Sequence, residues 1–203
     1  PLYSSAASDV YKRQGIYSDI VYSVFPRQGI GSFYSGIPYV DFPFEYPIFV
    51  GVLTMIASKV AWAIHPSAGV YFNESGLLIF YFITFVFIAI ATYYIAEDLY
   101  YISNKLNYSL GRAVIFFGFP SFIIYGVYSW VLVALAFLLR SIRLFIEGKY
   151  TLSYFILSLS IATNIFSIFA LVPFAREMWS SSRIRALKLS LFSLLLFVVY
   201  NIP

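Results

Sequence analysis

The sequence predicts an all-α fold, a polytopic bundle of transmembrane helices in which some helices are short or re-entrant. Of its 203 residues, 61% are hydrophobic and only 11% are charged, whereas soluble domains carry roughly a quarter charged residues. A soluble chain this short has too little interior to bury so many apolar side chains. Long uncharged runs separated by short basic clusters complete the pattern, which suits lipid as the solvent.

The two ends of the chain differ from the rest. Residues 1–14, PLYSSAASDVYKRQ, are polar and resemble the translated read-through of a sequencing-library adaptor; the alternative is a disordered tail. The chain stops directly after an apolar run. We therefore expect a non-native tail over residues 1–14 and a partial transmembrane domain, truncated at both ends, over residues 15–203.

The first half of this domain is predicted to begin with a segment at the membrane–water boundary and to end with a membrane-spanning helix. Residues 15–46 mix aromatic residues, Gly and Pro with a few charges, a composition typical of the membrane–water boundary. Residues 47–64 are apolar but include Lys59, which would cost about 3 kcal/mol deep in lipid, so we expect an interfacial or partly buried helix. Residues 76–96 are uncharged and long enough for one bilayer crossing.

Three further apolar runs follow, and basic clusters separate them. The runs cover residues 113–139, 152–175 and 189–200. The basic clusters lie within residues 105–112, 140–149 and 176–188. Basic loops beside membrane helices are expected on the cytoplasmic side, so the relative positions of the clusters test the topology.

Two topologies are open. If each run crosses once, the middle basic cluster lies opposite the other two. If the first two runs are hairpins of short helices, all three clusters share the cytoplasmic side. Breaks at Pro120 and Pro173 favour hairpins, with turns at residues 128–130 and at Asn164. Both turns would then face the same side as Asp19.

Residue types exclude several functions. The chain has no cysteine, which excludes disulfides, thiolate zinc sites and Cys nucleophiles. His65 is the single histidine and has no neighbouring Cys, Asp or Glu, so a capping or interfacial role suits it better than metal binding. The net charge of +4 lies in clusters between apolar runs, so no nucleic-acid partner is expected. Trp62, Trp130 and Trp179 are interpreted as interface anchors.

The carboxylates near the start are the most informative polar groups. Asp19 lies in YSDIVY, and Asp41 and Glu45 lie in PYVDFPFEYP, residues 38–47. An ionised carboxylate among aromatic residues at a membrane edge is costly unless it is paired. The simpler interpretation is that Asp19 is a solvated loop residue and that Asp41 and Glu45 cap the helix beginning near Pro47.

Two segments resemble the N-terminal half of polytopic GT-C glycosyltransferases, and the likeness is closest to the family-87 and PIG-M-like mannosyltransferases. The segments are GIYSDIVYSVF and GIPYVDFPFEYPIFVGVL, and an irregular linker separates them. The likeness continues with a basic turn near Arg112, the turn at residues 128–130 and LSIATNIFSIFALVP. It implies inverting transfer of a hexose such as mannose, from a polyprenyl- or dolichyl-phosphate sugar to a hydroxyl of a glycan or glycolipid acceptor. It also implies a multi-pass membrane protein with its active face extracytoplasmic.

The resemblance implies roles for individual residues. Asp19 matches the loop carboxylate taken as the general base, which must be ionised and close to the acceptor hydroxyl. Asp41 and Glu45 match the second acidic motif and would hold sugar hydroxyls or orient nearby side chains. Arg27 is the first choice to stabilise the leaving lipid phosphate. The implied site is catalytic Asp19 with substrate-binding Arg27, Tyr39, Asp41, Glu45, Tyr46 and Asn164, and no metal ligand.

The chain departs from the family pattern at three positions. Val21 stands where some relatives have a second acidic residue, Val131 where Asp is common, and Asn164 where Lys is usual. An altered substrate, an inactive relative and a sequencing error all remain open. No cofactor is expected beyond the donor lipid; a divalent metal stays open, without support in the sequence. A transporter or channel subunit and an inactive membrane scaffold are the alternatives; the uncharged residues 76–96 disfavour a transporter.

Overall fold

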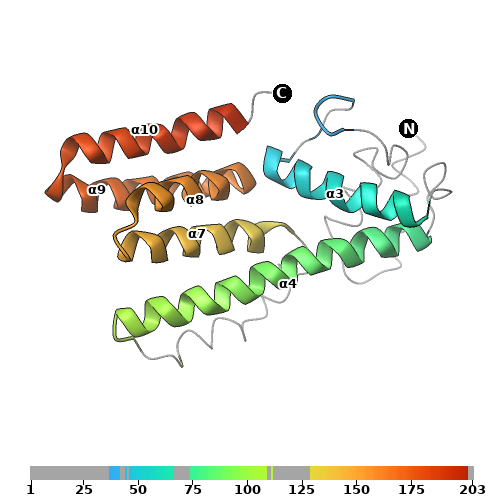
Figure 1. The fold of residues 1–203 in the computed structure, drawn as a ribbon, viewed down its shortest axis with the longest axis horizontal. Helices are drawn as coiled ribbons and strands as arrows, with labels where there is room; N and C mark the ends of the chain where they lie inside the picture. Colours follow the sequence, from blue (N-terminus) through green and yellow to red (C-terminus); the bar gives the residue numbers. More distant parts are fainter. Residues whose placement is uncertain are drawn as a thin grey trace, which may run out of the picture.

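The computed structural model describes residues 37–41, 44, 46–65, 74–108, 111 and 129–200, and the structural statements below concern these residues. They are helical and form no extended strand, so the all-α prediction is confirmed for them. The elements are α3 (Ile48–Ile64), α4 (Glu74–Lys105), α7 (Val131–Ile146), α8 (Tyr150–Thr163), the 3-10 helix η3 (Ile165–Ala170), α9 (Leu171–Ser181) and α10 (Arg183–Tyr200), as Figure 1 shows.

Helix α4 is the longest of the described helices, and the others lie along one side of it (Figure 1). Its 32 residues extend about 48 Å. Within the described ranges, residues 75–105 form the one helix that is long and apolar enough to cross a membrane. The uncharged run at residues 76–96 lies inside it, but the helix does not end there. It continues for more than two turns, through Glu97 and Asp98, to Lys105.

The other helices pack in layers on α4. Helix α3 covers the N-terminal half of α4 and α7 covers its C-terminal half, while α8 packs on α7 and α10 packs on α8 and α9 (Figure 1). The rings of Phe49 and Phe137, with centroids 5.2 Å apart, join the start of α3 to α7. One hydrophobic core unites Val50 of α3, Ile88 of α4 and Leu132 of α7. The starts of α3 and α7 therefore meet near the middle of α4.

The run at residues 152–175 is a hairpin with its turn at Asn164, as predicted. Asn164 has an extended backbone, with φ −149° and ψ 116°, and its side chain accepts a hydrogen bond from the Phe166 N–H at 3.1 Å. The hydroxyls of Ser160 and Ser167 lie 2.8 Å apart across the turn. Further from it, the rings of Tyr154 and Phe174 lie 5.8 Å apart. These contacts pair residues on both sides of Asn164, so the chain reverses there.

The basic clusters lie at one end of the bundle. The C-terminal end of α4, the α7–α8 turn and the α9–α10 turn are neighbours at the left of Figure 1. Ion pairs join Arg140 to the C-terminal part of α4, and one cleft is lined by both Lys149 and Arg185. In the described residues the middle cluster therefore lies at the same end as the others, as the hairpin topology predicts. Residues 113–128, which include most of the first predicted hairpin, lie outside the described residues, so that hairpin stays a prediction.

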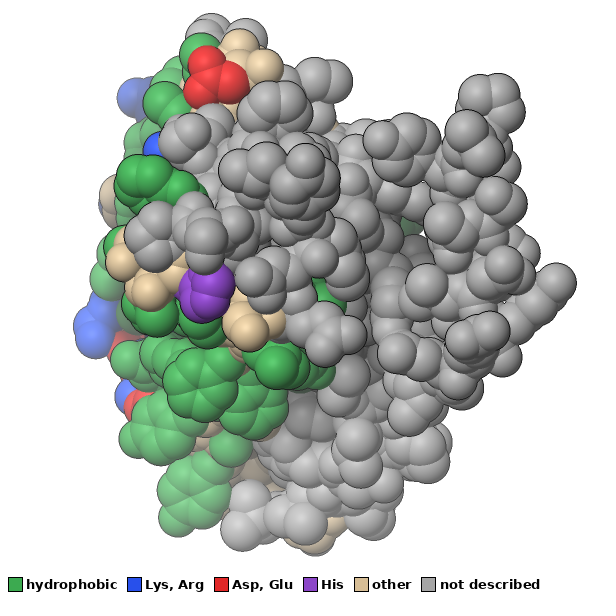
Figure 2. Space-filling model, turned by 90° about the vertical axis from the view of Figure 1, so that its right-hand side faces the viewer, with side chains coloured by type: hydrophobic (Ala, Val, Ile, Leu, Met, Phe, Trp, Pro, Cys, Tyr) green, Lys and Arg blue, Asp and Glu red, His purple; other side chains and the backbone are tan. Residues whose placement is uncertain are grey.

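The described helices expose large apolar side chains and bury small polar ones. Leu78, Phe82 and Ile184 are each at least 66% exposed. Figure 2 shows hydrophobic side chains across the coloured part of one face. Several hydroxyl side chains are instead at most 4% exposed: Thr54, Ser58, Thr84, Ser141, Ser153, Ser158, Ser160, Thr163 and Ser193. Small residues at helix contacts are typical of membrane helices, and soluble monomers rarely expose extended apolar surfaces.

The three tryptophans differ in environment. Trp130 is 4% exposed in the core of α3, α4 and α7, and its Nε1 has no hydrogen-bond partner among the described residues. Its interpretation as an interface anchor is therefore wrong. Trp62 and Trp179 are 44% and 43% exposed, as an anchor would be. The Arg183 guanidinium lies over the Trp179 ring, 5.8 Å from its centroid.

Candidate functional site

The structure describes four of the seven residues of the predicted site. They are Tyr39, Asp41, Tyr46 and Asn164. The other three, Asp19, Arg27 and Glu45, lie outside the described residues. The predicted convergence of the carboxylates can therefore be followed only for Asp41 and its surroundings.

The loop before α3 is organised around Tyr39. Its phenol donates a hydrogen bond to the Tyr46 carbonyl at 2.5 Å, and its ring covers Gly51 in the first turn of α3. Phe44 packs edge-on against the same ring, with centroids 5.4 Å apart. Burial raises the pKa of the Tyr39 phenol far above its usual range, against the opposing effect of the Gly51 N–H. The hydroxyl is therefore a permanent donor, and Tyr39 fastens the loop to α3.

The backbone of Tyr39 lies in the left-handed region, with φ +69°. This conformation costs an ordinary residue about 1–2 kcal/mol. The hydrogen bond to Tyr46 and the contact with Gly51 offset that cost, because both depend on the position of the ring. The described contacts of Tyr39 and Tyr46 thus hold the acidic loop in place.

Asp41 is exposed and closes its own turn. Its Oδ2 accepts a hydrogen bond from the Ile37 N–H at 2.7 Å, and the Asp41 N–H bonds back to the Ile37 carbonyl at 2.9 Å. The residue preceding α3 is Pro47, which provides no side-chain cap. The interpretation of Asp41 as a cap of that helix is therefore wrong. Asp41 orders the loop while its carboxylate stays accessible to solvent.

Gly51→Ala tests how firmly Tyr39 holds this loop. A Cβ at position 51 would lie 2.5 Å from Cε2 of Tyr39, so the ring must move, and we expect its bond to Tyr46 to weaken. We expect a loss of about 1–3 kcal/mol in the free energy of unfolding, measured by Trp fluorescence in detergent. Tyr39→Phe is the matched control, because it removes only the hydrogen bond and should cost about 1 kcal/mol. An Ala variant as stable as the wild type would contradict this packing.

Asn164 lies at the same end of the α7–α8 pair as the start of α3. Helices α3 and α8 are in contact, and the start of α3 adjoins the end of α8 in Figure 1. The side-chain oxygen of Asn164 caps η3. No hydrogen bond joins Asn164 to residues 37–41 among the interactions of the described residues. The structure therefore brings Asn164 and the acidic loop to one region without a direct hydrogen bond between them.

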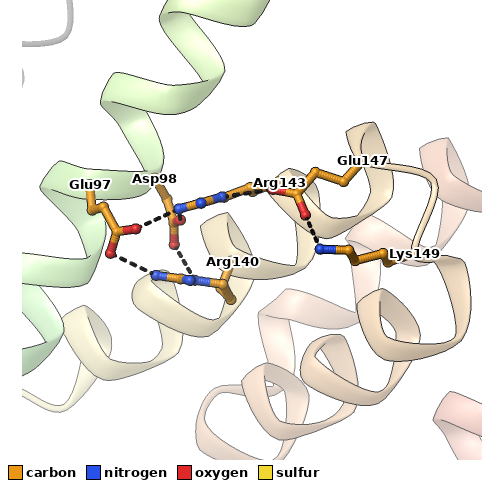
Figure 3. Close-up of polar contacts among 6 residues, drawn as sticks. All are labelled: Glu97, Asp98, Arg140, Arg143, Glu147 and Lys149. Carbon is orange, nitrogen blue, oxygen red and sulfur yellow. Dashed lines mark hydrogen bonds and ion pairs between the residues drawn. The ribbon is translucent and has the colours of Figure 1, made fainter.

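The strongest polar cluster of the described structure was not predicted. Figure 3 shows that Glu97 and Asp98 on α4 face Arg140 and Arg143 on α7. Arg140 donates from Nε to Asp98 at 2.9 Å and from Nη2 to Glu97 at 3.1 Å. Arg143 donates from Nη1 to Glu97 at 2.7 Å and to Asp98 at 3.1 Å. The Asp98 side chain is fully buried, and both arginines are at least 72% buried.

This ion-pair cluster extends into the α7–α8 turn (Figure 3). Glu147 accepts from Arg143 Nε at 3.0 Å and from Lys149 Nζ at 2.7 Å. The hydrogen bonds from these two cations hold the pKa of the Glu147 carboxyl below its usual range, and the bond from Lys149 has the larger effect. The turn closes through Gly148, whose φ of +77° is readily adopted only by glycine. The cluster therefore joins the C-terminal part of α4 to α7 and to the start of α8.

The role of this ion-pair cluster is to stabilise the fold. Arg140 bridges two carboxylates and Arg143 bridges three. The two guanidiniums also lie over the rings of Tyr94 and Tyr101, at 4.9 and 4.4 Å from the centroids. Such paired groups have little capacity left to transfer a proton or bind a substrate. No group of three side chains suited to a metal is found among the described residues.

Spacing alone does not reveal this cluster, because its partners are 42–46 residues apart. One local signal was available. Arg140 and Arg143 are three residues apart and so share a helix face. An adjacent Glu97–Asp98 pair directly after an uncharged run is costly unless cations meet it.

Over the described residues, the fold and the site are those of an all-helical protein with one membrane-capable helix and with polar groups at opposite ends of the α7–α8 pair. Comparisons with protein-family models, curated proteins and solved structures found no match.

Proposed function

We propose that this chain belongs to a multi-pass membrane glycosyltransferase of the GT-C type. It transfers a hexose such as mannose, with inversion, from a polyprenyl-phosphate sugar to an acceptor hydroxyl. The observation that carries the proposal is the turn at Asn164. This turn puts Asn164 and the acidic loop before α3 in one region and leaves the basic clusters at the other end of the hairpin.

Membrane embedding is the first step of the proposal. The exposed apolar faces of α3, α4 and α10 need a nonpolar solvent, and the buried serines and threonines suit close helix contacts in lipid. Basic residues near membrane helices favour the cytoplasmic side, which places the acidic loop on the extracytoplasmic side. A lipid-linked sugar donor would then reach that loop from within the bilayer.

The catalytic step assigns one role to each charged group. Asp19 accepts the proton of the acceptor hydroxyl as that oxygen attacks the anomeric carbon, and the bond from this carbon to the lipid phosphate oxygen breaks. Arg27 stabilises the charge that develops on the departing phosphate. Asp41 binds sugar hydroxyls with the carboxylate that its own turn holds in place. Tyr39 and Tyr46 keep this loop against α3.

A transporter is the alternative from another class. It needs ionisable side chains along an open path through the bilayer. Asp98 is the one fully buried acidic residue of the described part, and both of its neighbouring cations are bound to it. Because this carboxylate is saturated by ion pairs, the described geometry favours the transferase over a transporter.

The direct test of the proposal is sugar transfer. Membranes from cells that produce the chain are incubated with radiolabelled polyprenyl-phosphate mannose, with the glucose analogue and with candidate lipid acceptors. We expect label to pass to an acceptor outside the cytoplasm, and to do so above the level of membranes without the chain. Donor binding without transfer would indicate an inactive relative, and absence of both would refute the proposal.

Cysteine labelling tests the sidedness. Because the chain has no cysteine, single-cysteine variants report one position each. An impermeant maleimide should label Val40→Cys on intact cells, whereas Asn107→Cys and Ser182→Cys should need permeabilised cells. Val40 is 70% exposed beside Asp41, and the other two positions follow α4 and α9 at the basic end. Labelling of all three from outside would contradict the proposed orientation.

A further inference from the structure

A cleft of about 550 Å³ lies at the basic end of the bundle, between the α7–α8 turn and α10. One wall consists of Gly148, Lys149 and the first residues of α8, and the other consists of Arg185 and Leu189. The cleft is therefore formed by two helical segments that are distant in the sequence. It is remote from the acidic loop before α3.

The two cations of this cleft differ in their partners. Lys149 is 61% exposed and shares Glu147, at 2.7 Å, with Arg143. Arg185 is exposed, and its guanidinium has no carboxylate partner among the described residues. The carboxylate nearest to the cleft is thus already shared by two cations, and the cleft keeps a net positive charge. This charge fits an anion.

Part of the cleft is apolar. Leu152, which is 47% exposed, and Leu189 line it beside the two cations. A free phosphate ion would gain nothing from these side chains, whereas the acyl chains of a lipid would cover them. Basic pockets between membrane helices are suited to acidic lipid headgroups.

We propose that this cleft binds the phosphate headgroup of an anionic membrane lipid, with its acyl chains against Leu152 and Leu189. Arg185 and Lys149 contact the phosphate, and the hydroxyl of Thr151, which also lines the cleft, is available as a donor. The proposal depends on membrane embedding but not on sugar transfer, so an inactive relative would bind the lipid equally well.

Lipid retention tests the proposal. The full chain is purified in neutral detergent and mixed with equimolar phosphatidylglycerol and phosphatidylcholine. Native mass spectrometry then identifies the lipids that stay bound, from the mass of each complex. We expect the wild type to retain phosphatidylglycerol in preference to phosphatidylcholine. Arg185→Gln should lower this preference roughly fivefold, because one basic contact to the phosphate is lost.

Lys188→Gln is the matched control. It removes the same charge from an exposed position of the same helix but does not line the cleft. It should leave the preference unchanged, and Arg185→Lys should restore most of it. Equal loss in Arg185→Gln and Lys188→Gln would indicate general surface attraction and would overturn the proposal. Thermal unfolding of each variant in detergent confirms that it is folded.

Inorganic phosphate distinguishes the two sources of the ligand. Added in millimolar excess, it should leave phosphatidylglycerol bound, because the ion cannot replace the apolar contacts of the acyl chains. Complete displacement would show that the cleft recognises phosphate alone and would overturn the assignment to a lipid.

Discussion

Asp98→Asn is expected to lower the free energy of unfolding by about 3–5 kcal/mol, the usual cost of removing one partner from a buried ion pair. Asp98 is fully buried and accepts from both Arg140 and Arg143. An amide of the same shape cannot balance two guanidinium charges, so α4 and α7 lose their main polar contact. Unfolding in detergent, followed by Trp fluorescence, measures the loss.

Glu97→Gln is the control for this prediction. Glu97 contacts the same two arginines but is 38% exposed, so water can replace part of its contribution. We expect a loss of about 1 kcal/mol or less. If both variants lose the same stability, burial does not decide the strength of the cluster. If Asp98→Asn is as stable as the wild type, the pairing of α4 with α7 through Asp98 is wrong.

Asp19→Asn is expected to reduce the rate of sugar transfer by about 10²–10⁴-fold, the usual contribution of a general base. The amide cannot accept the proton of the acceptor hydroxyl at neutral pH. Because substrate binding does not need this proton transfer, kcat should fall while KM for the lipid donor changes little. Radiolabel transfer in membranes with equal amounts of wild type and variant gives both constants.

Two further carboxylates serve as controls for Asp19. Asp9→Asn changes the same group within residues 1–14, which are expected to be non-native, and should leave the activity unchanged. Asp41→Asn should raise KM more than it lowers kcat, because Asp41 is proposed to bind the sugar. Full activity of Asp19→Asn would remove Asp19 as the base, and loss of activity in Asp9→Asn would contradict the interpretation of the tail.

Local residue patterns predicted much of the fold. The uncharged residues 76–96 predicted the N-terminal two-thirds of α4, and the break at Asn164 predicted the reversal of the chain there. Both features depend on neighbours in the sequence: an unbroken apolar run predicts a helix, although not where it ends, and a turn follows from a residue whose side chain accepts a hydrogen bond from the backbone two residues on. The helical all-α class follows from the same patterns.

The contacts of the site were less predictable. Tyr39 and Tyr46 were predicted to bind substrate, and the structure also gives them a role in fastening the loop to α3. That role depends on the missing side chain of Gly51, twelve residues after Tyr39, and no local pattern relates the two. Trp130 was misinterpreted for a similar reason, because only the packing of α3 against α4 and α7 shows that it is enclosed.

The sequence by itself determined that the chain is helical, rich in apolar surface and reversed at Asn164, because composition and local hydrogen bonding decide these features. Only the tertiary structure decided that Asp98 meets Arg140 and Arg143, and that Arg185 shares a cleft with Lys149. The physical reason is that an ion pair depends on distance in space. Helix packing alone brings together charges that are 36–46 residues apart in these two clusters.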